Sequence, residues 1–159
     1  MSRAEQLRIP AAIAIASLVA YVLGYDFTSL FPGYLPKIGG LWSAISAIVV
    51  TQVTRKEARN SASMRVLGSA IGAATSAVYL SLLPFHPLGM ALAIFATGVI
   101  CTALNVPNHG RLASITVIVV MVTASLDPAL NPLLNALLRF VESCIGTAVA
   151  LLGLLLWRR

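Results

Sequence analysis

Long apolar runs alternate with short polar links along this chain, and prolines stand near the ends of the runs. An uninterrupted apolar run is typical of a helix that crosses a membrane, and proline favours helix ends. The pattern predicts six transmembrane helices, over residues 9–24, 40–53, 64–83, 88–104, 112–126 and 132–157. Pro10 is expected at the start of the first helix.

The fifth predicted helix is short for a membrane span. At about 1.5 Å per residue, its roughly 15 residues reach about 22 Å of a hydrocarbon core of about 30 Å. We therefore expect this helix to be extended at its ends or sheltered by protein.

Composition supports a membrane protein. Hydrophobic residues make up 58% and charged residues 10% of the 159 residues, and the mean hydropathy is +0.91. A soluble domain carries about a quarter charged residues. We expect one all-α transmembrane domain over residues 1–159, embedded in the lipid bilayer. The net charge of +6 lies between apolar runs, so it indicates topology rather than nucleic-acid binding.

Basic residues predict the orientation, since they are enriched in cytoplasmic segments. An even number of spans puts both termini on one side, and that side carries Arg3, Arg8, Arg55, Lys56, Arg59, Arg65, Arg111, Arg158 and Arg159. Only Lys37 falls opposite, and Arg139 falls within a helix. Both termini are therefore expected in the cytoplasm.

A ten-residue stretch recurs along the chain. Residues 65–74 (RVLGSAIGAA) return as residues 139–148 (RFVESCIGTA), with Arg, Ser, Ile, Gly and Ala at the same offsets. The offset of three helices reverses the chain's direction, which predicts two inverted three-helix repeats, an arrangement found in transporters. Gly68 and Gly72 form a GxxxG pair, which predicts close packing with another helix.

Arg139 and Glu142 are the most unusual residues of the predicted spans. They stand three apart, so they share a helix face and are able to pair. Ionisable groups inside a membrane are costly and usually face a bundle interior or a wet cavity. We interpret Arg139 as an anion contact and Glu142 as its orienting partner or a proton carrier. The alternative is an ion pair that locks the sixth helix in place.

Other polar residues have both a functional and a structural interpretation. Arg65, at the expected start of the third helix, is more simply a cytoplasmic anchor than a substrate contact. Trp42, Ser46 and Gln52 make the second helix polar, which suits a path for a carboxylate beside an aromatic wall. Hydrogen bonding between helices explains the same residues equally well.

The sequence contains no recognisable catalytic motif. His86 and His109 lie in separate links on opposite sides, and no paired carboxylates or glycine-rich phosphate loop is present. We therefore expect no enzyme activity, no metal site and no cofactor.

The stretch GLWSAISAIVVTQVTRKEARNSASMRVLGSAIGA, with the later NHGRLASITVIVVMV and RFVESCIGTAVALL, resembles the membrane half of a known superfamily. This is the fusaric acid resistance protein-like and aromatic acid exporter superfamily. By position, its motif residues here are Arg65, Gly68, Gly72, Arg139 and Gly146, the glycines serving helix packing.

The resemblance implies a six-helix unit of the bacterial inner membrane that exports small organic anions such as aromatic carboxylates. Larger members carry two such units or a soluble domain, so we expect two copies of this chain to form a homodimer. The alternative function is a non-transporting scaffold that binds lipid or a partner protein through the basic loop at residues 55–59.

Overall fold

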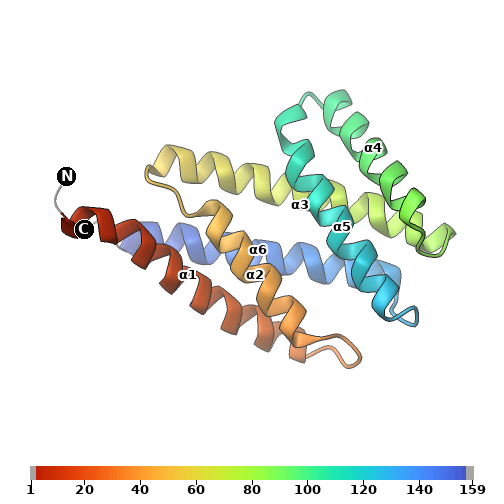
Figure 1. The fold of residues 1–159 in the computed structure, drawn as a ribbon, viewed down its shortest axis with the longest axis horizontal. Helices are drawn as coiled ribbons and strands as arrows, with labels where there is room; N and C mark the ends of the chain where they lie inside the picture. Colours follow the sequence, from red (N-terminus) through yellow and green to blue (C-terminus); the bar gives the residue numbers. More distant parts are fainter. Residues whose placement is uncertain (1–2, 157–159) are drawn as a thin grey trace. The chain divides into compact units, whose positions relative to one another are not determined.

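The computed structural model describes residues 3–156, with side chains from Leu7 onward. These residues form six α-helices, one short 3-10 helix and no strand (Figure 1). The elements are α1 (Arg3–Ser29), α2 (Pro36–Val50), α3 (Arg55–Leu82), α4 (Pro87–Ala103), η1 (Pro107–His109), α5 (Gly110–Leu126) and α6 (Pro132–Leu156). The predicted six-helix, all-α class is confirmed. The predicted helix end at Trp157 and the anchors Arg158 and Arg159 lie outside the described residues.

Within the described residues, four helical segments are long and apolar enough to cross a membrane, namely Leu7–Ser29, Arg55–Leu82, Pro107–Leu126 and Pro132–Leu156. The expected extension of the fifth helix at its ends is confirmed, because η1 runs directly into α5 and gives a segment of 20 residues. The short apolar helices are instead α2, with 15 residues, and α4, with 17. At about 1.5 Å per residue, α2 covers only about 22 Å of a core of about 30 Å.

The first helix is longer than predicted at both ends. It begins at Arg3, so Pro10 lies inside the helix rather than at its start. It also continues past Gly24 to Ser29, because Gly24 is a packing contact and not a stop. A Cβ at Gly24 would lie 2.6 Å from the carbonyl oxygen of Gly39. The glycine therefore lets α2 approach α1 closely.

The third helix begins nine residues earlier than predicted, at Arg55 instead of Met64. A capping box explains the early start. Glu57 N donates to Thr54 Oγ1 at 3.2 Å, and Thr54 N donates to Glu57 Oε2 at 3.1 Å. The basic stretch is therefore helical, and Arg65 lies well inside α3 rather than at its start. At that position the side chain does not face the N-terminal end of the helix dipole, which would disfavour a positive charge.

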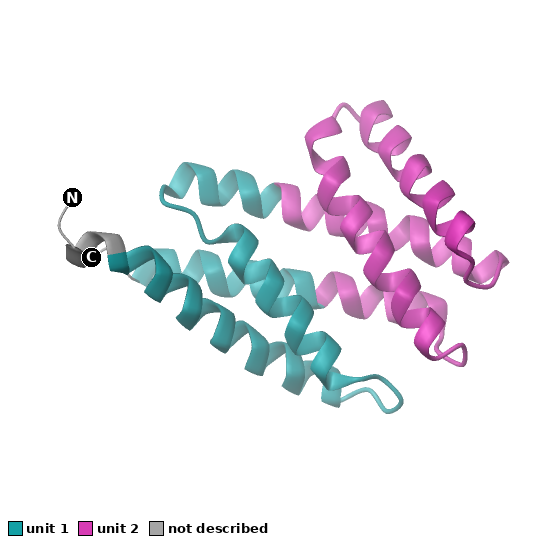
Figure 2. Cartoon of the chain, viewed as in Figure 1, with its two compact units in different colours: residues 1–63, 142–159 teal, residues 64–141 magenta. Residues whose placement is uncertain are grey.

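Two compact units make up the chain, and we describe each by itself (Figure 2). Unit 1 comprises residues 1–63 and 142–159. Its α1 and α2 form an antiparallel hairpin (Figure 1). Its core is built from small side chains of α1, α2 and α6, among them Ala16, Ala20, Ala47 and Ala150. Small side chains allow helix backbones to pack closely in a membrane.

Unit 2 comprises residues 64–141. Its α4 and α5 form a second antiparallel hairpin (Figure 1). One core cluster joins Ala73 and Ala77 of α3 to Val120 of α5 and Ala136 of α6. A second cluster joins α4 to α5 through Ala93, Val117 and Met121.

Candidate functional site

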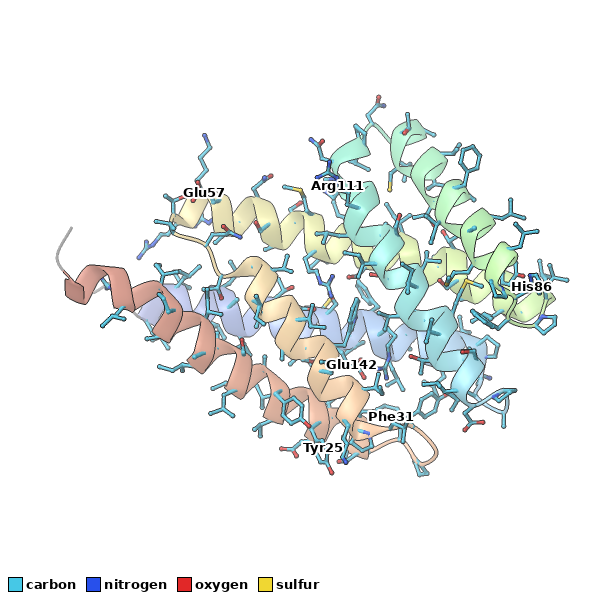
Figure 3. The ribbon with its side chains drawn as sticks, in the orientation of Figure 1. Tyr25, Phe31, Glu57, His86, Arg111 and Glu142 are labelled. Carbon is cyan, nitrogen blue, oxygen red and sulfur yellow. The ribbon has the colours of Figure 1, made fainter. Side chains whose placement is uncertain are left out.

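Glu142 is a fully buried carboxylate in unit 1, on α6 (Figure 3). Its Oε1 accepts a hydrogen bond of 2.6 Å from Thr28 Oγ1, near the end of α1. This distance lies at the short end of the range for hydrogen bonds between two oxygen atoms. The extension of α1 to Ser29 therefore places a donor on the most buried acidic group of the unit.

Serines of α2 surround the same stretch of α6. Ser43 Oγ donates to the backbone oxygen of Glu142 at 3.0 Å. Ser46 Oγ lies 3.4 Å from Ser143 Oγ and also donates to the backbone oxygen of Trp42 at 2.8 Å. All these hydroxyl groups are buried. Glu142 thus belongs to a polar cluster supplied by three helices of unit 1.

Two glycines bring the helix backbones close to this cluster. A Cβ at Gly39 of α2 would lie 2.7 Å from Glu142 Oε1. A Cβ at Gly146 of α6 would lie 2.8 Å from Ser46 Cβ and would also collide with the backbone oxygen of Ser43. Gly146, expected from sequence to serve helix packing, lies against α2. Larger side chains at either position would separate the helices that hold Glu142.

Of the three polar or aromatic residues predicted on the second helix, two lie on α2 and the third, Gln52, lies beyond its end. Trp42 and Ser46 lie in the interior of unit 1, with Trp42 only 2% exposed. Gln52 is not on the helix, which ends at Val50 because Thr51 takes an extended conformation. The Gln52 side chain is half-buried and donates from Nε2 to the Val49 backbone oxygen at 2.9 Å. It thereby stabilises the end of α2.

Unit 2 contains the two buried arginines. Arg65 of α3 is 0% exposed and Arg139 of α6 is 1% exposed. The single acidic residue among residues 64–141 is Asp127, which is exposed after α5 and accepts from the backbone nitrogen of Ala129. Unit 2 therefore buries two guanidinium groups and contributes no carboxylate of its own to its interior.

The predicted GxxxG pair lies where α5 approaches α3 in unit 2. A Cβ at Gly68 would lie 3.1 Å from the backbone nitrogen of Ala113, and a Cβ at Gly72 would lie 2.9 Å from Thr116 Cβ. Beside them, Thr116 Oγ1 lies 3.4 Å from Ser69 Oγ. The small residues therefore bring two helices together one turn after the buried Arg65.

Sequence reasoning missed two residues that join helices through polar contacts. The pattern places Thr28 in a loop because Gly24 resembles a helix end, although no proline follows before Pro32. Asn135 is fully buried in unit 2, and its Nδ2 donates to the backbone oxygen of Val120 at 2.9 Å. An amide in an otherwise apolar run was the signal for Asn135.

A groove of about 620 Å³ runs along unit 1 between α1 and the C-terminal half of α6. Its walls are mostly apolar, and Arg8 lies among its lining residues. None of the residues predicted to bind substrate belongs to the described lining. Within the described part of the chain, no three His, Cys, Asp or Glu side chains gather as they would to hold a metal ion.

Comparison with known families gives a match over residues 13–153, to the family described as fusaric acid resistance protein-like. The chain belongs to this family. The resemblance seen in the sequence is thus confirmed. Neither the comparison with curated proteins nor the comparison with solved structures finds a match. Together with the long apolar helices, membership indicates a multi-pass membrane transporter.

Proposed function

We propose that this protein exports small organic anions, such as aromatic carboxylates, across the bacterial inner membrane as a homo-oligomer. The family takes its description from resistance to fusaric acid, which is itself an aromatic carboxylic acid. An exporter of such compounds needs a cationic group within the membrane that attracts the carboxylate on its way through.

The observation that carries the proposal is the burial of Arg139 inside the membrane-spanning helix α6, with 1% exposure. A charged side chain inside a membrane is costly and is usually retained for function. The planar guanidinium group matches a carboxylate in a bidentate geometry. Arg65, buried in α3, adds a second positive charge to the same unit.

Glu142, three residues after Arg139 on α6, has two roles in this proposal. It orients the guanidinium group in the absence of substrate, and it is a proton carrier if export is coupled to protons. The hydroxyl of Thr28 holds its carboxylate in place. Ser46 and Gln52, as polar side chains, and Trp42, as an aromatic wall, are the further substrate contacts that we propose in unit 1.

The test is flux of radiolabelled benzoate in proteoliposomes made with the pure protein. Arg139→Gln removes the charge, and we expect flux to fall at least tenfold, because a loss of about 1.4 kcal/mol in stabilisation of the bound anion corresponds to a factor of ten. Arg139→Lys retains the charge without the bidentate geometry and should retain part of the flux. Arg111→Gln, at an exposed arginine, is the matched control and should transport like the wild type.

Size-exclusion chromatography of each variant separates loss of transport from loss of folding. Unchanged benzoate flux in a well-folded Arg139→Gln variant would contradict the role of Arg139. Absence of flux in the wild type, for benzoate and for other aromatic carboxylates, would contradict export itself.

A second candidate function is a scaffold that binds anionic lipid or an acidic partner. It is favoured by Arg55, Lys56 and Arg59, which are exposed together on the first turns of α3. If this function holds, neutralising the three residues abolishes whatever growth phenotype the protein confers on cells, whereas Arg139→Gln affects that phenotype only as far as it lowers the amount of folded protein.

A further inference from the structure

The groove of unit 1 has a continuous apolar wall on α1. Its lining residues there include Ile9, Ala12, Ala16, Val19 and Leu23. These residues are spaced by three and four, so they form one stripe along a helix face. The opposite wall comes from the last turns of α6, where Val149, Gly153 and Leu156 line the groove. Ala16 and Ala20 of α1 belong to the same buried core cluster as Ala150 of α6.

The length of this wall fits an extended hydrocarbon chain. From Ile9 to Leu23 the stripe covers 14 residue steps, or about 21 Å at about 1.5 Å per residue. One leaflet accounts for about half of a hydrocarbon core of about 30 Å. The groove is thus at least as long as one leaflet is deep. A small aromatic acid would fill only part of it.

One end of the groove is cationic. Among the described residues that line it, Arg8 alone carries a charge, and its side chain is exposed. Arg8 belongs to the basic set that the sequence predicts on the cytoplasmic side, where the membrane surface is rich in anionic lipids. A long apolar wall that ends at a cation complements a ligand with a long apolar tail and an anionic head.

We propose that this groove binds one anionic phospholipid, with an acyl chain along the α1 stripe and the headgroup phosphate at Arg8. The proposal is independent of the transported substrate, because the groove and the residues assigned to transport are different. The lipid would stabilise the contact between α1 and α6, which otherwise rests on small side chains.

A second copy of the chain fits the groove less well, because it has few carboxylates to offer to Arg8. Of the acidic side chains that the structure describes, Glu142 is buried and Glu57 is bonded to Thr54. Asp26 and Asp127 lie at the C-terminal ends of α1 and α5, which the sequence predicts on the outer side. Charge complementarity therefore favours the lipid.

Glycine substitutions provide a direct test. A Cβ at Gly153 would meet no atom within 4 Å, so Gly153→Leu fills the groove without disturbing the packing of unit 1. Gly98 of α4 is also half-buried, and a Cβ there would likewise meet no atom within 4 Å, but Gly98 lies outside the groove. Gly98→Leu is therefore the matched control, with the same change in helix propensity.

The measurement is native mass spectrometry of the purified protein in detergent, after incubation with equimolar phosphatidylglycerol and phosphatidylcholine of identical acyl chains. We expect the wild type and Gly98→Leu to retain more phosphatidylglycerol than phosphatidylcholine. Gly153→Leu should retain at least fivefold less of either lipid. Arg8→Gln should lower the preference for phosphatidylglycerol about fivefold, which corresponds to about 1 kcal/mol for one basic residue near an anionic surface. Excess benzoate or inorganic phosphate should not displace the lipid.

Four outcomes would overturn the proposal. Equal retention of the two lipids by the wild type would contradict recognition of the anionic head. Retention by Gly153→Leu equal to that of Gly98→Leu would contradict binding in the groove. Displacement by benzoate would show that the groove takes a small carboxylate. A loss of dimer in Gly153→Leu, with lipid retention unchanged, would show that the groove holds a second copy.

Discussion

The two units bury charges of opposite sign. Unit 1 holds the carboxylate of Glu142 with a hydroxyl donor from another helix. Unit 2 holds the guanidinium groups of Arg65 and Arg139 and has Asp127, at its surface, as its single acidic residue. Among the described residues, the buried guanidinium groups lie in one unit, whereas the other unit has hydroxyl groups that hold a buried carboxylate.

The packing of the two units is similar despite this difference in charge. In unit 1, Gly146 lets α6 approach the backbone of α2 at Ser43. In unit 2, Gly72 lets α3 approach the backbone of α5 at Ala113. Both contacts join helix backbones with no side chain between them, and both lie beside buried polar residues. The units therefore share a packing principle and differ in the chemistry that it positions.

The largest loss of stability should come from adding a methyl group at the close backbone contacts of the two glycines. Gly146→Ala and Gly72→Ala place a Cβ against backbone atoms, and we expect each to lower the free energy of unfolding by about 3 kcal/mol, the upper range for overpacking. Gly98→Ala, where the space is open, should instead raise it by up to about 1 kcal/mol through helix propensity. Unfolding in mixed micelles by denaturing detergent measures all three variants.

A loss in only one of the two glycine variants would break the similarity between the units. If Gly98→Ala were as destabilising as the other two variants, the loss of stability would be a general effect of replacing a helical glycine and would not result from close backbone contact.

A smaller effect should follow from removing the donor to Glu142. Thr28→Val keeps the shape of the side chain and removes the hydrogen bond to the buried carboxylate. Leaving a buried polar group without its hydrogen-bond partner costs about 1–3 kcal/mol, so we expect a loss of about 2 kcal/mol in the free energy of unfolding. Thr102→Val, at an exposed threonine bonded within its own helix, is the control and should change stability by less than about 0.5 kcal/mol. Equal losses in both variants would refute a special role for Thr28.

The smallest effect is expected at the buried amide of unit 2. Asn135 donates from Nδ2 to Val120, but its Oδ1 has no hydrogen-bond partner among the described residues. A typical intramolecular hydrogen bond contributes about 0.5–1.5 kcal/mol net, and burial of the leucine side chain offsets part of its loss. Asn135→Leu should therefore change the free energy of unfolding by no more than about 1 kcal/mol. A loss above about 2 kcal/mol in the same unfolding assay would show that unit 2 depends on buried polar contacts as strongly as unit 1.

Much of the fold was predictable from local pattern. Apolar runs and prolines predicted six helices, because each helix buries its own backbone hydrogen bonds whatever its neighbours do. The helix ends were less predictable. A glycine such as Gly24 looks the same in the sequence whether it ends a helix or lies against a neighbouring helix. Only the position of the Gly39 backbone shows that Gly24 is a packing contact. The start of α3 could have been predicted from the sequence, since Thr54 and Glu57 have the spacing of a capping box.

Composition and local spacing were enough to establish the membrane class, the number of helices, the family and the identity of the unusual buried charges. These properties depend on each run of residues and on neighbours within one helix. The tertiary structure was needed to show that Thr28 reaches Glu142, that Gln52 donates a hydrogen bond to the end of α2, and that a groove ending at Arg8 lies along α1. Such contacts join residues far apart in the chain, and their geometry is set by how closely the helix backbones approach, which no local pattern specifies.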